Sequence, residues 1–474
     1  MKTFNKILLA TGLCLLFSCD VIHQEPEDRI AESNYWKTQA DAVSAIIGVY
    51  DRVQSLALYN PLAYVASTDE VTFNNAADGY LQFNAHNLTV DNTQVEAYWQ
   101  FNYSGMHRVN DIISRVPGIN DKAFTEEEKA EIVAEAKFLR AYFYYNLVNG
   151  YGGVPIVVKP YESFNVDFTI PKSTVAEVYS QISSDLADAE TNIPNSFSDA
   201  IQTRGRATKG AAKALLAKVY LTTKEYRKAA DKATEVINNP LYTLVTGATN
   251  YTNMFTPAGR NTSEAIWEVQ FVSSTSEGHG LHSRFMPQSN QSTTVGGQYQ
   301  IVPSQKIQDA FDPGDIRKDA SIAVSTTPQF KTAGQPYVKK HNRSNSNEDP
   351  NIIALRLADI ILIRAEALNK LGETAAAIAD LNTIRRRAFN VPLTTPSVYD
   401  YPNASDIAKN FDLTAAIENE RFLELAFEGH RWMDLKRNNR AEAVLGIPTF
   451  RTVWPIPQRE RNRNPKLEQN TDYK

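Results

Sequence analysis

Between residues 127 and 153, apolar side chains recur at every third or fourth position, which is the spacing of one face of an α-helix. The members of this face are Ala134, Phe138, Ala141, Tyr145 and Val148. Glycines at positions 150, 152 and 153 end the run, as is typical of a helix C-terminus. A second helix is predicted between Thr174 and Pro194, with an apolar stripe formed by Val178, Ile182, Leu186 and Ala189.

Two later segments share a spacing of small and apolar residues that a single helix does not explain. The same offsets separate the members of both sets, which are Ala217, Tyr220, Ala229, Ala233 and Val236, and Ala365, Leu368, Ala377, Leu381 and Ile384. Small residues at the first and third positions allow two antiparallel helices to approach closely. Each segment is therefore predicted to be a helical hairpin, and the unit resembles the tetratricopeptide repeat. The two units are far apart in the sequence, so long insertions must leave the scaffold.

Residues 241–351 contain few helical signals and many Gly, Ser, Gln, Asn and Thr residues. One strand is predicted at 265–271, where Trp267, Val269 and Phe271 alternate with Glu268 and Gln270. The rest is predicted to be long loop, and long loops on a rigid helical scaffold usually carry function or are disordered. The predicted fold is mainly α, with helical pairs at about 127–240 and 352–440, loop-rich insertions at about 68–92 and 241–351, and little β structure.

The N-terminus follows a different pattern. Lys2 and Lys6 precede a mostly apolar run over residues 7–17, which is too short to span a bilayer as a helix. Residues 1–18 are therefore predicted to be a signal peptide that is removed. Ser18 and Cys19 at its end resemble a bacterial lipobox, in which the cysteine is acylated, so Cys19 is the predicted lipidation site. The alternative is an ordinary secretory signal whose cleavage site contains a cysteine.

The only other cysteine, Cys14, lies inside the signal, so its removal leaves one thiol and no disulfide. An acyl anchor on Cys19 gives that thiol a use. Residues 20–34 are polar and acidic and lack periodicity, which predicts a tether between the lipid and one folded domain at 35–474.

Composition fits a globular domain, with 42% hydrophobic and 22% charged residues and a formal net charge of −5. No Lys/Arg-rich run interrupts the mixed surface, so the charge pattern argues against binding to nucleic acid or to anionic lipid. After residue 18 no apolar stretch reaches the ~20 residues of a membrane helix. The lipid is the only membrane anchor that the sequence predicts.

Several blocks resemble one known family. Residues 138–145, Phe-Leu-Arg-Ala-Tyr-Phe-Tyr-Tyr, and residues 151–155, Tyr-Gly-Gly-Val-Pro, are similar to a helix signature of the SusD/RagB outer-membrane lipoproteins of Bacteroidota. Residues 357–369, 381–385, 420–437 and 455–470 are similar to its later motifs. The resemblance implies a SusD-like superhelix of helices on the cell surface. It also implies a partner, a SusC-like TonB-dependent outer-membrane transporter, to which the protein delivers oligosaccharides or, in some members, peptides.

No residues are expected to be catalytic. Glu420, Glu424 and Glu428 form a helical stripe with arginines nearby, but a glycosidase needs two carboxyl groups that face each other across a sugar in different environments. A structural role is predicted for this stripe, and Trp432 is predicted to be a packing residue. His279 and His282 are three positions apart without a third ligand, so neither a metal site nor a cofactor is expected.

A glycan site needs aromatic rings among amide, carboxylate and guanidinium groups on accessible loops. Residues 68–92 have this composition, and a second segment at 285–300 is its predicted partner. The ligand-binding residues proposed from the sequence are Asn74, Asp78, Tyr80, Phe83, Asn84, Gln298 and Tyr299. The alternative is that the first segment folds Phe73 and Phe83 into a minor core. Trp99 is predicted to be a core residue and is left out of the site.

The function that these patterns and the resemblance favour is capture of oligosaccharide or polysaccharide by a non-enzymatic lipoprotein of the outer membrane, facing the cell exterior. One alternative keeps the fold and changes the ligand to peptides, as in the RagB-like branch. Another is a hydrolase on a helical-repeat scaffold, which would release reducing sugar or cleaved peptide.

Overall fold

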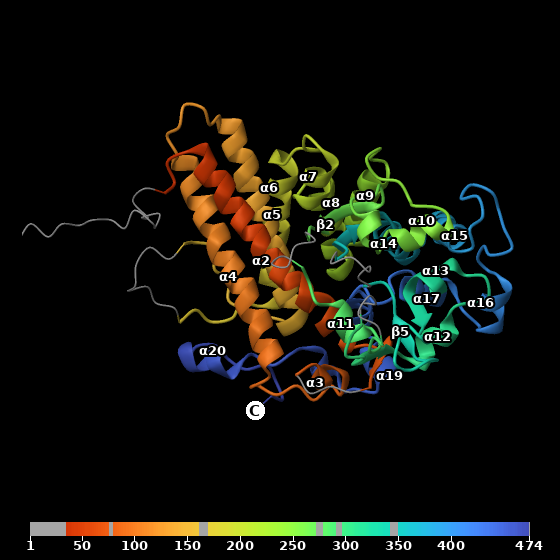
Figure 1. Cartoon of the computed structure of the whole chain (residues 1–474). Coiled ribbons are helices and arrows are strands. Elements are labelled where there is room, and N and C mark those ends of the chain that lie inside the picture. The colour runs from red at the N-terminus through yellow and green to blue at the C-terminus, as the bar shows by residue number, and fades with distance from the viewer. Residues whose placement is uncertain are drawn as a thin grey trace, which may run out of the picture.

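The computed structural model describes residues 35–74, 79–160, 169–271, 278–290, 296–341 and 349–473. On one side of the molecule, four long helices lie side by side as a bundle (Figure 1): α2 (Gln39–Ala66), α4 (Thr93–Arg115), α5 (Glu126–Tyr151) and α6 (Val175–Asn192). Threonine caps begin three of them, because Thr38, Thr125 and Thr174 each form a reciprocal capping box with the acidic residue three positions later. The helices predicted at 127–153 and after Thr174 are confirmed as α5 and α6.

Both predicted helical hairpins are present. The first consists of α8 (Lys209–Thr222) and α9 (Tyr226–Ile237), and the second of α14 (Leu357–Lys370) and α15 (Thr374–Ala388). The alanines at the predicted close approaches, Ala217, Ala229, Ala365 and Ala377, are fully buried. α14 also packs on α9, so hairpins that are far apart in sequence are direct neighbours in space. The prediction of a mainly α fold built from such hairpins is therefore confirmed.

The segment between the hairpins is more ordered than the sequence indicated, and the prediction of long loop outside one strand was wrong. Its elements are three to six residues long, which is too short for apolar periodicity to reveal them. They are α10 (Ala248–Asn253), η3 (Pro257–Gly259), β2 (Ala265–Val269), α11 (His282–Phe285), β3 (Ile301–Pro303), α12 (Gln305–Ala310), α13 (Ile316–Ser321), β4 (Ile322–Val324) and β5 (Pro336–Val338).

The strands form three antiparallel pairs in the described parts of the chain. β1 (Val71–Phe73) pairs with β3, β2 pairs with β6 (Ile352–Arg356), and β4 pairs with β5. The strand predicted at 265–271 is confirmed over residues 265–269, but both of its faces are buried. Glu268, expected on a polar face, is 1% exposed and accepts hydrogen bonds from the Asn351 side chain (2.8 Å) and the Asn261 main chain (2.9 Å). These bonds replace the water that an exposed face would supply.

The remaining elements surround the hairpins and close one end of the bundle. They are α3 (Tyr80–Asn84), η2 (Val116–Gly118), α7 (Ala200–Gly205), α16 (Ala404–Ala408), α17 (Leu413–Glu424), α18 (Arg431–Arg437), α19 (Ala441–Leu445), η4 (Thr449–Thr452) and α20 (Gln458–Arg463). Trp454 packs the C-terminal part of the chain against the bundle. Its ring contacts those of Tyr64, Phe83, Tyr98 and Tyr151. Trp432 and Trp99 are buried packing residues, as predicted.

The sequence analysis did not predict α2, the longest of these helices. Its apolar residues are spread around the helix rather than along one stripe, and Pro61 lies within it. Within the described ranges, no helix is both long and apolar enough to cross a membrane.

Candidate functional site

The two segments that the sequence analysis proposed for ligand binding lie side by side. β1 and β3 pair with Phe73 opposite Ile301. One position further, the Asn74 main-chain N–H donates to the Gln300 carbonyl at 3.0 Å, and the Asn74 amide donates to the Tyr299 carbonyl at 3.4 Å. The strand pair therefore holds the exposed Asn74 against the loop that carries Tyr299.

That loop is fixed by its main chain. The N–H groups of Gly297, Gln298, Tyr299 and Gln300 donate to carbonyls of residues 283–287 at 2.6–3.0 Å. A Cβ at Gly297 would lie 2.5 Å from the Ser283 carbonyl oxygen, so only glycine allows this approach. Tyr299 has a φ of +52° and is half-buried, and its hydroxyl donates to the Pro336 carbonyl at 2.9 Å. The turn that carries Tyr299 is therefore held in place by these hydrogen bonds.

A guanidinium group lies beside these two segments. Arg284 of α11 donates to the Gln300 side-chain oxygen, and its guanidinium carbon lies 5.8 Å from the centroid of the Tyr80 ring. Tyr59 of α2 is also near Arg284: burial raises the pKa of Tyr59, and the positive charge of Arg284 lowers it in part. We call Tyr59, Asn74, Tyr80, Arg284, Tyr299 and Gln300 the tyrosine–arginine surface.

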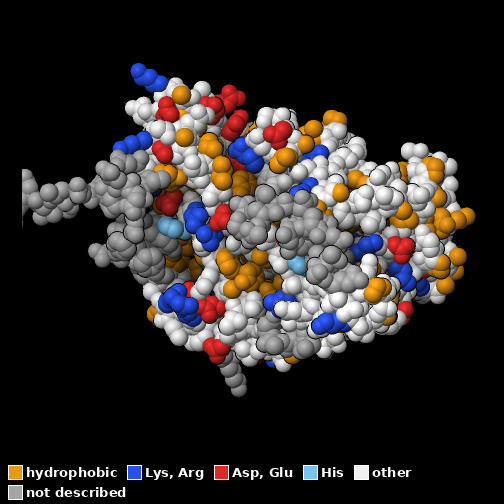
Figure 2. Space-filling view, viewed as in Figure 1, with side chains coloured by type: hydrophobic (Ala, Val, Ile, Leu, Met, Phe, Trp, Pro, Cys, Tyr) orange, Lys and Arg blue, Asp and Glu red, His pale blue; other side chains and the backbone are white. Residues whose placement is uncertain are grey.

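Rings, amides and one guanidinium on neighbouring segments are the groups that bind the faces and hydroxyls of a sugar. On the face shown in Figure 2, apolar side chains gather beside α2 near the centre of the view, with Lys and Arg side chains around them. The arrangement can bind and orient a polar ligand. Nothing in it resembles the paired acid and base of a hydrolase.

Part of the predicted set has another place in the fold. Phe83 is 1% exposed and packs edge-on against Trp454, with ring centroids 5.1 Å apart. Phe83 therefore belongs to the core, as in the alternative in which this segment forms a minor core. Its prediction as a ligand-binding residue was wrong. Tyr80 is 4% exposed, and its ring lies next to the Arg284 guanidinium. The Asn84 amide donates to the Ala66 carbonyl at 3.1 Å. Gln298 is exposed beside Tyr299. Asp78 and Cys19 lie outside the described residues.

Sequence reasoning missed Tyr59 and Arg284, whereas Gln300 was noted beside Gln298 and Tyr299 in the proposed segment 285–300. Arg284 is the residue directly before that segment, so the composition of the segment was a usable signal. Tyr59 comes from a helix far away in the sequence, and only the packing of α2 brings it to the site.

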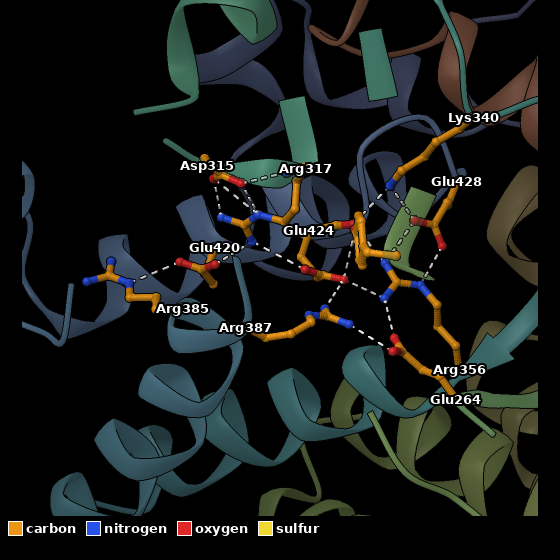
Figure 3. Close-up of polar contacts among 11 residues, drawn as sticks. Glu264, Asp315, Arg317, Lys340, Arg356, Arg385, Arg387, Glu420, Glu424 and Glu428 are labelled. Carbon is orange, nitrogen blue, oxygen red and sulfur yellow. Dashed lines mark hydrogen bonds and ion pairs between the residues drawn. The ribbon is translucent and has the colours of Figure 1, made fainter. Parts of the chain in front are cut away.

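The glutamate stripe that could be mistaken for catalytic carboxylates is a buried ion network (Figure 3). Arg356 bonds Glu264 at 3.0 Å and Glu428 at 2.7 Å, and Lys340 bonds Glu428 at 2.7 Å. The buried ion network consists of Glu264, Asp315, Arg317, Lys340, Arg356, Arg385, Arg387, Asp406, Glu420, Glu424 and Glu428.

Neighbouring cations favour the charged form of Glu424 and Glu428 in this network. Burial alone would raise the pKa of Glu424, but the positive charges of Arg387, Arg356 and Arg317 hold it well below its usual range. Burial is likewise outweighed at Glu428, where Arg356 and Lys340 lower the pKa to about 2. A general acid needs a raised pKa, so the structural role predicted for this stripe agrees with its surroundings.

The two histidines singled out in the sequence are buried. His279 bonds the Pro350 carbonyl at 2.9 Å, and His282 lies 3.5 Å from Asp349. Across the described ranges, no group of three or more His, Cys, Asp or Glu side chains is arranged to hold a metal ion.

The architecture defines a class: mainly helical proteins built from helical hairpins with long inserted segments between them. Comparison with known proteins gives the family. Residues 27–221 match a family model described as "Starch-binding associating with outer membrane", and residues 324–449 match the SusD family model. The chain belongs to the SusD-like family.

Relatives and solved structures cover nearly the whole chain. SusD-like protein P38 of Formosa agariphila is 29% identical over 520 residues, which cover 100% of both chains. A solved structure titled "Laminarin binding SusD-like protein" has a TM-score of 0.76 and 27% identity, covering 92% of this chain and 100% of that one. "Surface glycan-binding protein A" from Bacteroides fluxus shares the fold, with a TM-score of 0.77, 22% identity, and coverage of 92% and 100%. The family consists of binding proteins that are generally not enzymes. No catalytic residue was predicted from the sequence of this chain.

Proposed function

We propose that this protein captures oligosaccharides or polysaccharides at the tyrosine–arginine surface. The observation that carries the proposal is that β1 and β3 bring the two sugar-suited segments together, with Asn74 bonded to the loop of Tyr299 and Arg284 beside them. Membership of the SusD-like family and the laminarin-binding structural relative support carbohydrate as the ligand class.

The mature protein is proposed to begin at Cys19, to be acylated there after loss of residues 1–18, and to carry its single domain at 35–474 on a tether of residues 19–34. Through the lipid it is held in the outer membrane and faces the cell exterior. It delivers its ligand to a SusC-like TonB-dependent transporter. Replacement of Cys19 by Ala should abolish palmitate labelling and membrane partitioning, and copurification of a large outer-membrane protein with the wild type tests the partner.

Binding is tested by affinity electrophoresis and calorimetry on the mature protein, with a polysaccharide panel that includes laminarin. Tyr299→Ala and Arg284→Ala should each weaken binding by about tenfold to a hundredfold, because each removes a ring or a charge-assisted donor. The matched control is Arg227→Ala, an exposed arginine of α9 that pairs with Glu373. Saccharide binding that survives both surface changes unaltered would move the site elsewhere.

The same measurements separate the alternatives. Binding of peptides but of no saccharide would replace the proposal with peptide capture. Release of reducing sugar or cleaved peptide by the purified protein would indicate a hydrolase.

A further inference from the structure

A cavity lies at the lower end of the bundle, where α20 runs beneath α4 (Figure 1). It encloses about 520 Å³ between α4, α20 and the extended segments around residues 155–157 and 170. This volume lies within the range of about 300–1,000 Å³ that is typical of small-ligand sites. None of the residues of the tyrosine–arginine surface lines it.

The lining combines apolar walls with polar groups of several kinds. Tyr103 and the edge of Trp99 form one wall, with ring centroids 4.9 Å apart, and Val157, Ile170 and Leu467 form the others. The polar groups are Gln100, Glu460, Arg463 and Asn464. An amide donor and acceptor, a carboxylate and a guanidinium beside a tyrosine ring are groups that bind the hydroxyls and faces of a saccharide.

The walls of the cavity are preformed, because hydrogen bonds within the protein hold them in place. The Asn464 amide donates to the Ile170 carbonyl at 2.7 Å, and the Tyr103 hydroxyl donates to the Pro155 carbonyl at 2.8 Å. The Gln100 amide bridges Glu96 at 2.8 Å and Glu460 at 3.3 Å, which ties α4 to α20. A preformed site loses less conformational entropy when a ligand binds.

A peptide would bind this cavity poorly. Peptides gain affinity by pairing their main chain with an exposed strand edge, but the carbonyls of Pro155, Val157 and Ile170 in the extended wall already accept hydrogen bonds from side chains. Pro155 has no N–H and its carbonyl accepts from Tyr103, the Val157 carbonyl accepts from Tyr144 at 3.0 Å, and the Ile170 carbonyl accepts from Asn464. The Val157 N–H also donates to the Tyr144 hydroxyl, at 2.6 Å.

We infer that this groove between α4 and α20 is a second saccharide site, which takes a short neutral oligosaccharide through Gln100, Glu460 and Asn464 against the Tyr103 wall. The inference rests on the proposed function for its ligand class, but not for its location. Charged side chains of both signs gather at the lower left of Figure 2, where α20 runs, so that the groove rim has no single sign of charge. A neutral polar ligand suits such a rim.

The test uses calorimetry of the mature protein with the oligosaccharides that bind best in the panel. The groove variant is Gln100→Ala with Glu460→Ala, and the surface variant is Arg284→Ala with Tyr299→Ala. The matched control is Asn462→Ala, an exposed residue of α20 that does not line the groove. We expect the surface variant to retain a weaker residual site, and the groove changes, added to it, to weaken that residual binding by about tenfold or more. A crystal soaked with the same oligosaccharide should show a sugar beside Tyr103.

The other possible results distinguish failure of the groove inference from failure of the proposed function. If the surface variant alone abolishes binding, the groove inference falls and the proposed function stands. If only the groove variant loses binding, the groove is a saccharide site and the proposed location moves there. If the wild type binds no saccharide, both fall, and loss of peptide binding in the groove variant would overturn the ligand class.

Discussion

The buried ion network and the tyrosine–arginine surface both use arginine, but in opposite surroundings. Arg317 is 1% exposed and bonds Asp315, Glu420 and Glu424, whereas Arg284 is partly exposed beside an aromatic ring and an amide. Surrounded by carboxylates, a guanidinium is fully engaged within the protein. Beside a ring and an amide, it forms part of a surface that suits a neutral polar ligand. The partners of a charged residue thus indicate its role better than its charge does.

The two regions are connected through the inserted segment. The network joins Glu420 of α17 to Arg317 in α13, and Lys340, which follows β5, donates to the Glu424 carbonyl at the end of α17. β5 in turn accepts the Tyr299 hydroxyl at the Pro336 carbonyl. The network therefore holds in place the segment that presents half of the proposed ligand surface.

The largest expected effect comes from breaking the network at its centre. Arg317→Met leaves Asp315, Glu420 and Glu424 buried without this partner, and should lower the free energy of unfolding by about 3–5 kcal/mol. Arg284→Met should change it by less than about 1 kcal/mol. Thermal and denaturant unfolding measure both, with Arg227→Met as the exposed control. Equal losses at positions 317 and 284 would remove the distinction between the regions.

As the pH falls, the buried ion network should be weakened before the tyrosine–arginine surface is affected. A carboxylate whose folded pKa is lowered stabilises the fold above its unfolded pKa, and that contribution is lost as the pH falls through the folded value. For Glu428 the window runs from its ordinary value of 4.5 down to about 2. The unfolding midpoint should fall across this range, and less steeply in Glu428→Gln, which is already less stable at pH 7. An exposed control, Glu373→Gln, should keep the wild-type slope.

The sequence could predict the hairpins because the close approach of two helices demands small residues at fixed offsets, as at Ala217 and Ala229. The short elements of residues 241–351 could not be predicted, since three to six residues are too few to show a period. For the site, composition identified the two segments but not which rings face outward. Phe83 and Tyr299 are both aromatic residues in polar segments, so the sequence does not distinguish their roles. In the structure Phe83 packs against Trp454 and belongs to the core.

A smaller effect is expected at Glu70, which lies directly before β1. Burial raises its pKa to about 8, although the Phe427 N–H at 2.9 Å and the Thr68 hydroxyl at 3.0 Å favour the charged form. A raised carboxyl pKa costs stability as the pH rises from about 4.5 to 8. Glu70→Gln keeps an acceptor for Phe427 and should raise the unfolding midpoint at pH 8 by about 1–3 °C. At pH 4 the two proteins should be equally stable, and a variant that is less stable at pH 8 would contradict the assignment.

The smallest effect is expected at Asn74, whose exposed amide bonds the Tyr299 carbonyl at 3.4 Å. Asn74→Ala removes a long, solvent-exposed hydrogen bond worth about 0.5–1 kcal/mol and leaves the bond from its main-chain N–H to Gln300 intact. Stability should fall by no more than that amount, and saccharide affinity should fall by about two- to fivefold. Gln305→Ala, another exposed polar change outside the tyrosine–arginine surface, should leave affinity unaltered. A loss of affinity at Asn74 as large as at Arg284 would mean that the Asn74 amide contacts the ligand directly.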